Sequence, residues 1–283
     1  MSFAIVVDST CDMTLDELAT LNIKMVPLTI SVGGESFLDQ YEISSPTFYE
    51  RMAAANELPK SAQPSPASFI KAYEEQVVAG HEGVLAICIA HVLSGTVQSA
   101  RLAADQVNFP VEVVDCAGAA AQFSLVVQEA ARLRSEGLSL DKAAAKLAER
   151  IAQTEFLIAC ETLENLLKGG RLKPEEAEAA AKLNIKPVLT FDEMGVLHAY
   201  DKVRGMSGAR KLFASELEKR TAELGRQRVR ICHANNPAEA ENLRRTLEET
   251  GIDFEDAGTC ICGATVGTHL GAGALGIAFI TAE

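Results

Sequence analysis

Two hydroxyl side chains follow an apolar stretch at the point where a strand would turn into a helix. Residues 84–90 are apolar with no polar alternation, which is typical of a strand buried on both faces of a parallel sheet. Ser94 and Thr96 follow, and apolar residues at helical spacing begin at Val97. Hydroxyls and unpaired backbone amides would meet there at the positive end of a helix dipole, so this turn is suited to binding an anion. An isolated serine in this position more often only caps its helix.

Two more polar groups are candidates for the same site. Ser61 lies in a proline-punctuated polar stretch, residues 57–66, which predicts an extended loop ahead of a helix. His269 lies in the glycine-rich stretch 263–276, where glycines leave room for a ligand and an imidazole can change its charge near neutral pH. A lone histidine is more often a surface or satisfied core residue, so its role depends on what lies near it.

A serine hydrolase is one alternative. Ser94 would be its nucleophile. His233 or His269 would act as the base, and Asp8 or Asp115 would orient that base. The sequence has no Gly-x-Ser-x-Gly elbow, Walker loop or dinucleotide fingerprint to favour an enzyme of these kinds. Asp8 itself is better explained as a turn residue that accepts backbone hydrogen bonds.

Composition narrows the classes of partner. The 283 residues carry a formal net charge of −13, which argues against nucleic acid and anionic membrane surfaces as main partners. No stretch of about 18 apolar residues and no signal-peptide pattern is found, so we expect a soluble, cytoplasmic protein without stable membrane insertion. The seven cysteines are scattered, and we expect reduced core thiols rather than disulfides; Cys260 and Cys262 lack the second pair that a zinc site would need. No metal or cofactor is expected.

The order of the predicted elements indicates an α/β fold with two domains. Strands and helices alternate through residues 1–153, which predicts a parallel sheet flanked by helices. One of these strands is expected over residues 24–31. Residues 154–283 include a predicted hairpin over residues 184–203 and would form a mixed sheet with helices, and a further helix is expected from Lys173 to Ala181.

Seven short motifs together resemble the DegV family, in order and spacing, over essentially the whole chain. These motifs are Asp8-Ser9-Thr10, Ser61-Ala62-Gln63-Pro64, Ser94-Gly95-Thr96-Val97-Gln98-Ser99, Gly169-Gly170-Arg171, Asn184-Ile185-Lys186-Pro187, Lys202-Val203-Arg204-Gly205 and Gly267-Thr268-His269-Leu270-Gly271. The resemblance implies two α/β domains with a long-chain fatty acid buried between them. It also implies a binding subunit without catalysis of its own, which presents the fatty acid carboxylate to a separate fatty acid kinase ATP-binding subunit that forms an acyl phosphate for phospholipid metabolism.

The same resemblance assigns roles to individual residues. Ser61 and Ser94 match hydroxyls that contact the carboxylate, and Thr268 and His269 match the motif that completes the head-group site. Basic positions that face the partner match Arg171 and Arg204. On this assignment, Arg171→Ala should leave binding intact and slow phosphorylation.

The sequence departs from the family pattern at a few positions. Ser61 stands where the family commonly has Thr, Ala62 where it has Ser, and Ala272 where it has Pro or Ser. The small, Gly-rich helix opening is replaced by Ala120-Ala121-Gln122-Phe123. Phe123 therefore bears on the length and shape of the tail pocket. A carrier of another amphiphilic lipid, without phosphorylation, is the third function that the sequence leaves open.

Overall fold

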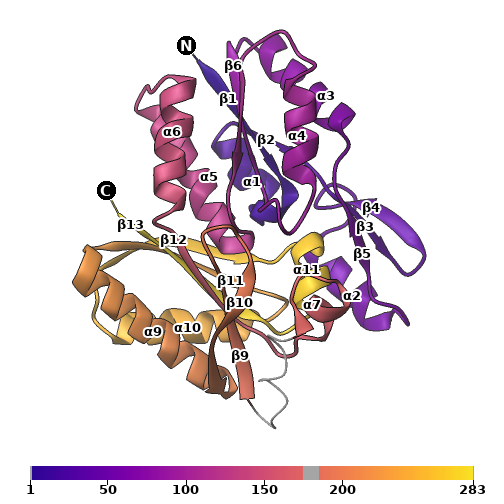
Figure 1. The fold of residues 1–283 in the computed structure, drawn as a ribbon. Helices are drawn as coiled ribbons and strands as arrows, with labels where there is room; N and C mark the ends of the chain where they lie inside the picture. The colour runs from indigo at the N-terminus through magenta and orange to yellow at the C-terminus, as the bar shows by residue number, and fades with distance from the viewer. Residues whose placement is uncertain (1, 175–184, 283) are drawn as a thin grey trace.

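The computed structural model describes residues 2–174 and 185–282, which form two layered α/β halves (Figure 1). In the first half, four parallel strands lie in the order β2-β1-β6-β7. Their bounds are β1 (Phe3–Asp8), β2 (Ile23–Val26), β6 (Gly83–Cys88) and β7 (Val111–Asp115). Every residue of β1 and β6 is buried. Most of the apolar stretch 84–90 therefore lies in a fully buried strand, as predicted.

Helices cover both faces of this parallel sheet. Alternate residues of β1 point to opposite cores: Ala4 and Val6 pack against one pair of helices, whereas Ile5 and Val7 pack against the other group. The first pair is α3 (Pro66–Val78) and α4 (Thr96–Ala104), and the second group is α1 (Leu15–Thr20), α5 (Ala120–Ser135) and α6 (Leu140–Ile151).

A second, antiparallel sheet branches from the first half. It has the order β4-β3-β5, with β3 (Thr29–Val32), β4 (Glu35–Leu38) and β5 (Lys60–Ala62), and α2 (Ser45–Ala54) connects β4 to β5. The single strand expected over residues 24–31 is therefore wrong. Pro27, which has no N–H to donate to a sheet, separates β2 from β3. Ser61 also lies on a strand rather than on the expected loop, paired with Ile30.

The second half is a mixed sheet, as the sequence predicts, and its six strands lie in the order β10-β9-β8-β13-β11-β12. The described helices on one face are α9 (Gly205–Leu224) and α10 (Pro237–Glu249), and α5 and α11 (Ala264–Leu270) pack on the other. Residues 175–181 of the helix expected from Lys173 lie outside the described residues. The strands are β8 (Glu155–Ala159), β9 (Ile185–Phe191), β10 (Leu197–Arg204), β11 (Gln227–His233), β12 (Phe254–Ile261) and β13 (Leu275–Thr281).

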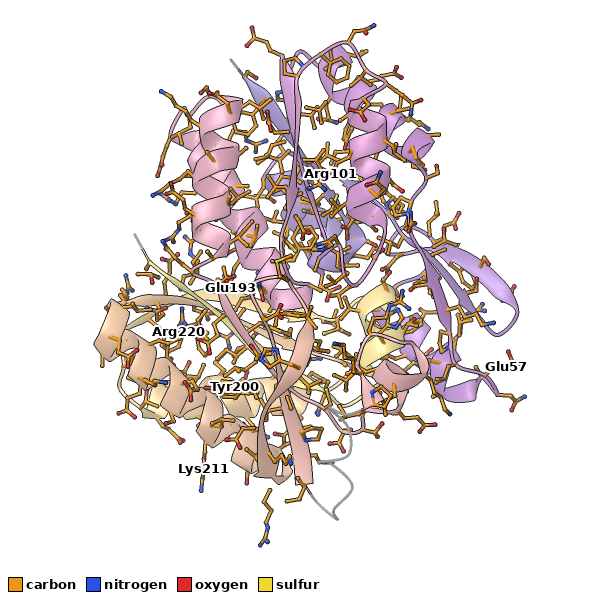
Figure 2. The ribbon with its side chains drawn as sticks, viewed as in Figure 1. Glu57, Arg101, Glu193, Tyr200, Lys211 and Arg220 are labelled. Carbon is orange, nitrogen blue, oxygen red and sulfur yellow. The ribbon has the colours of Figure 1, made fainter. Side chains whose placement is uncertain are left out.

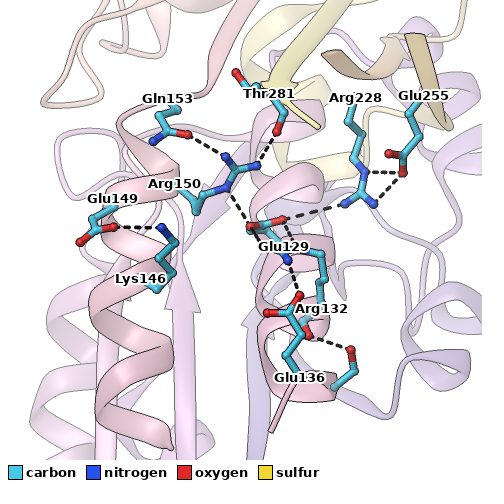
Figure 3. A network of polar contacts seen from close by, with 11 residues as sticks. Glu129, Arg132, Glu136, Lys146, Glu149, Arg150, Gln153, Arg228, Glu255 and Thr281 are labelled. Atoms are coloured by element: carbon cyan, nitrogen blue, oxygen red, sulfur yellow. Dashed lines mark hydrogen bonds and ion pairs between the residues drawn. The ribbon is translucent and has the colours of Figure 1, made fainter. Parts of the chain in front are cut away.

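Helix α5 lies between the two large sheets and carries a buried charge network that joins them. Its Glu129 accepts hydrogen bonds from Arg132, at 2.7 Å, and from Arg150 of α6, at 2.8 Å (Figure 3). Arg150 also donates to the backbone oxygen of Thr281 at the end of β13. The predicted domain division at residues 153/154 falls between α6 and β8, and it stays a prediction.

All seven cysteines are buried free thiols, as expected. Across the described residues, no helix is both long and apolar enough to cross a membrane.

Candidate functional site

A cavity with mostly apolar walls lies where the two large sheets face each other. Its apolar lining comes from both halves: the start of α5, strands β8, β9 and β10, helix α7 (Glu164–Lys168) and α11 all contribute. Five polar side chains also line it, and they are Ser61, Ser94, Arg171, Thr265 and His269. The apolar residues are Leu28, Ile89, Leu93, Ala119, Ala120, Phe156, Ile158, Leu166, Phe191, Leu197, Val266 and Leu270.

Ser61 and His269 meet in this cavity, although they are far apart in the sequence. The Ser61 Oγ and His269 Nε2 atoms are 2.9 Å apart. His269 Nδ1 is buried without a hydrogen-bond partner in the described part of the chain. It packs against Gly169 at the end of α7, where an added Cβ would come within 2.6 Å of it. Burial, together with the charge of Arg171, lowers the pKa of His269 to about 4, so the ring is neutral at pH 7.

Arg171 supplies the positive charge of the site. Its Nε donates to the Leu93 backbone oxygen at 3.2 Å, and its Nη1 donates to the Gly169 backbone oxygen. No ion pair with a carboxylate forms at this guanidinium among the residues that the structure describes. The resemblance predicts only a partner-facing role for Arg171; the structure places it on the cavity wall as well as in the groove outside.

Ser94 faces the cavity at the turn between β6 and α4. Its Oγ is 2.8 Å from the Thr96 Oγ1, and Thr96 itself is fully buried behind it. The N-cap of α4 is Gly95, and no side chain caps the helix, so the Ser94 hydroxyl is not used as a helix cap. An added Cβ at Gly95 would overlap the end of the Gln63 side chain, so Gln63, which donates to Ser99 Oγ at 3.0 Å, would have to shift.

Three of the predicted residues lie away from the cavity lining, and one of them is Thr96, which is buried behind Ser94. Thr268 donates its hydroxyl to the Ala264 backbone oxygen within α11, at 2.8 Å, and lines the outer groove. Arg204 is exposed at the end of β10, seven residues along the strand from Leu197 of the cavity wall. Thr265, which is not among the predicted residues, lines the cavity one helical turn before His269 and belongs to the same glycine-rich stretch.

Buried carboxylates hold the helix that carries His269. Asp39 accepts from the backbone N–H groups of Ala264 and Thr265 and from the Thr265 hydroxyl, at 2.6 to 3.2 Å. Asp12 accepts from the Gly263 N–H at 2.9 Å. Burial raises the pKa of both carboxyl groups above the usual range. These bonds attach the start of α11 to the first half, which fixes the ring of His269 beside Ser61.

Asp8 performs the turn role expected of it. It accepts from the Thr10 N–H at 2.9 Å and from the Ile89 N–H at 2.8 Å. Burial raises the pKa of Asp8 to about 6, against the opposing effect of these bonds.

The geometry does not assemble the hydrolase that the sequence left open. The Ser94 hydroxyl is bonded to Thr96 rather than to a histidine. The Asp115 carboxylate is 2.6 Å from Nδ1 of an exposed histidine, His91, and Nδ1 of His233 accepts from the Asn236 N–H. The serine–histidine pair in the cavity is Ser61–His269, and no carboxylate among the described residues bonds His269 Nδ1 to complete a triad.

Phe123 does not shape the cavity, contrary to the expectation from sequence. It is fully buried on the face of α5 that packs on the parallel sheet, together with Val126 and Val127. The opposite face of the same helix supplies Ala119 and Ala120 to the cavity, the latter at a left-handed φ of 55°.

A wide groove reaches the same polar side chains from outside. It has a volume of about 750 Å³ and shares Ser61, Arg171 and His269 with the cavity. Its outer rim includes the segment from Ala55 to Lys60 after α2, and Figure 2 shows Glu57 at the outer edge of this segment. The polar end of the cavity is thus next to solvent, while the apolar part extends inward.

Comparison with known proteins gives a consistent result. The model of a family described as "Uncharacterised protein, DegV family" matches residues 2–282. DegV domain-containing proteins of Streptococcus pneumoniae and Deinococcus radiodurans are 31% and 34% identical to the chain, over 99% and 98% of both sequences, respectively. A Thermus thermophilus structure, of a DegV family protein described by its fatty acid binding, has a TM-score of 0.92 at 30% identity and full coverage of both chains. The fatty acid-binding DegV of Bacillus subtilis has a TM-score of 0.89 at 27% identity, also with full coverage of both.

Proposed function

The chain belongs to the DegV family, and we propose that it binds a long-chain fatty acid between its two halves. The carboxylate would lie at Ser61, Ser94, Arg171 and His269, and the acyl chain would fill the apolar cavity. The observation that carries the proposal is an apolar cavity that ends at an arginine without a carboxylate partner in the described part of the chain. Fatty acid binding by the Thermus and Bacillus relatives supports it.

The physical requirements of such a ligand match both ends of the cavity. A buried carboxylate is costly unless charged or polar groups bond to it, and a guanidinium and two hydroxyls are available. Each methylene buried in the apolar part adds about 0.8 kcal/mol to binding. With a neutral ring, the tautomer that carries its proton on Nε2 donates to Ser61 and leaves the Ser61 hydroxyl free to donate to the carboxylate.

The proposal extends to presentation of the carboxylate to a separate kinase subunit. The outer groove reaches Ser61, Arg171 and His269 from solvent, so a partner can approach the head group while the tail remains buried. A carboxylate oxygen would attack the γ-phosphorus of ATP held by the partner, which releases ADP and leaves an acyl phosphate. In this proposal Arg171 contacts the head group, and Arg204 remains a candidate contact for the partner.

Mass spectrometry of lipid extracted from the gently purified protein tests the binding step. We expect about one long-chain fatty acid per chain, and its depletion in a Ser94→Ala, His269→Ala double variant. A Ser65→Ala variant is a suitable control, because Ser65 caps α3 and lies outside the cavity lining. A different amphiphile in the extract would favour the carrier of another lipid, and no lipid bound or taken up would contradict the proposal.

The kinase step has a separate test. The loaded protein is mixed with a fatty acid kinase ATP-binding subunit, ATP and hydroxylamine, which converts an acyl phosphate to a hydroxamate. We expect hydroxamate only when both proteins and ATP are present. Fatty acid bound without any hydroxamate would restrict the function to lipid carriage. Ester hydrolysis by the isolated chain would instead restore the hydrolase.

A further inference from the structure

A second hollow adjoins the inner end of the apolar cavity. This hollow, the distal groove, has a volume of about 520 Å³ and lies where α6 and the start of α5 meet the turn of the β9–β10 hairpin. It shares Phe156 and Phe191 with the cavity, and it shares none of the polar head-group residues. The two hollows therefore meet at these two aromatic rings.

The two rings form a thin partition. Their centroids are 5.4 Å apart, with 15° between the ring planes, so they stack. Phe156 is 3% exposed within β8. Phe191 is the last residue of β9, is only partly buried, and is followed directly by the hairpin turn. Phe191 is accordingly the ring that has room to move.

The lining of the distal groove suits one end of an amphiphile. Apolar side chains from α6 and the hairpin turn, including Ile151 and the 59% exposed Met194, provide surface for hydrocarbon. Its ionisable residues are mainly acidic and would repel a carboxylate. Figure 2 shows Glu193 of this set at the junction of the two halves. The acidic members are Asp115, Glu155, Asp192 and Glu193, and the basic member is His91.

We infer that the distal groove is an extension of the acyl site, which receives the methyl end of long chains when Phe191 turns away from Phe156. The inference rests on the proposed function, because it needs a fatty acid whose carboxylate is held at Ser61 and Arg171. Continuity of the two hollows across one aromatic pair identifies the occupant as the tail of that same chain. The structure thereby assigns Phe191 as a residue that sets the accepted chain length.

The inference changes the expected dependence of affinity on chain length. If the stacked pair were a fixed floor, affinity would fall sharply once a chain reached it. With the extension, each further methylene buried in the groove adds up to about fourfold in affinity. Ala148, an exposed residue of α6 that lines the groove, offers a way to obstruct this path with a larger side chain.

Binding of myristate, stearate and behenate, measured by displacement of a fluorescent fatty acid from delipidated protein, tests the inference. We expect wild type to bind behenate at least as tightly as stearate. Ala148→Trp should weaken behenate by about tenfold and leave myristate within about twofold, as an obstructed groove requires. The matched control is Ala145→Trp, which changes an exposed alanine of the same helix that does not line the groove.

Phe191→Leu gives a second test that does not depend on how well the tryptophan variant folds. A smaller side chain opens the partition, and we expect behenate to gain affinity relative to myristate. Equal changes for all three acids in both variants, or a sharp loss of behenate in wild type, would overturn the inference while the proposed function stands. Failure of wild type to bind any of the three would remove both.

Discussion

Two polar clusters lie at the junction of the two halves, and they differ in whether their charged side chains have oppositely charged partners. In the Glu129 network, each charged group has partners: Glu129 accepts from Arg132 and Arg150, and Arg228 pairs with Glu255 (Figure 3). At the cavity, the cation Arg171 bonds only backbone oxygens in the described part of the chain, and His269 Nδ1 has no partner there.

The titration of the two clusters differs for the same reason. Burial alone would raise the pKa of Glu129, but its bonds to Arg132 and the charge of Arg150 outweigh burial and lower it. Burial and the charge of Arg171 both lower the pKa of His269, and no carboxylate that the structure describes opposes them, so the ring is neutral. A saturated network holds the halves together, whereas unsaturated polar groups beside a cavity are available to a ligand.

Neutralising the network should give the largest loss of stability. Glu129→Gln removes the negative charge that Arg132 and Arg150 share, and the guanidinium of Arg150 is only 3% exposed. We expect the free energy of unfolding to fall by about 4 kcal/mol, measured by urea denaturation. Glu136→Gln is the matched control, because Glu136 is an exposed partner of Arg132, and it should change stability by about 0.5 kcal/mol or less. Similar losses in both variants would contradict the structural role of the network.

Changing the cation of the cavity, Arg171, should reduce ligand affinity rather than stability. Arg171→Gln removes the positive charge of the cavity wall, and we expect fatty acid affinity to fall by roughly 3 kcal/mol with little change in unfolding free energy. This replaces the sequence-based expectation that Arg171→Ala leaves binding intact. Lys168→Gln is the control, since Lys168 is exposed at the end of α7, shortly before Arg171, and pairs with Glu164. Intact binding in the Arg171 variant, measured by calorimetry, would return Arg171 to a purely partner-facing role.

The contrast between the clusters also shows what sequence can predict. The strand–turn–helix around Ser94 was predictable, because an apolar run and hydroxyls before a helical pattern are local features. The pairing of Ser61 with His269 depends on where α11 attaches to the first half, which local pattern does not specify. Resemblance to a family brought both residues into one site without giving their contact.

Other features were missed for physical reasons. The burial of Arg150 could not be predicted from the local pattern of its helix, because the Glu129 carboxylate that it bonds lies on another helix, α5. The sequence associates Phe123 with the tail pocket because it stands in a helix opening that is small and Gly-rich in the family. In a helix buried on two sides, residues three apart can serve different cores, and Phe123 faces the parallel sheet.

A smaller effect on binding is expected at the turn. Ser94→Ala removes one donor to the carboxylate and should weaken fatty acid affinity by about 1.5–3 kcal/mol, toward the lower end because Arg171 remains. Ser65→Ala is the control, because Ser65 caps α3 and does not line the cavity. Displacement of a fluorescent fatty acid measures both, and unchanged affinity in the Ser94 variant would exclude this hydroxyl from the head-group site.

The pH dependence of stability gives the finest comparison, because the pKa shifts of two buried groups, His269 and Asp8, change stability with pH in opposite directions. The pKa of His269 is about 4 in the folded state and near 6.5 when unfolded. Between these values the unfolded chain binds the extra proton, so the contribution of His269 to stability is complete above pH 6.5 and is lost as the pH falls toward 4. Asp8 has its pKa raised to about 6, so its contribution is present below pH 4 and is lost as the pH rises through 6.

Removing either group should therefore tilt the stability curve in opposite directions between pH 4 and 6.5. In His269→Gln the rise with pH disappears, and the difference in unfolding free energy from wild type should change by about 2 kcal/mol across this window. In Asp8→Asn the falling contribution disappears instead, so stability should rise more steeply with pH than in wild type. Urea denaturation at several pH values measures both. Parallel curves for His269→Gln and wild type would mean that the ring keeps an ordinary pKa, and the cavity would then hold a second positive charge beside Arg171 at mildly acidic pH.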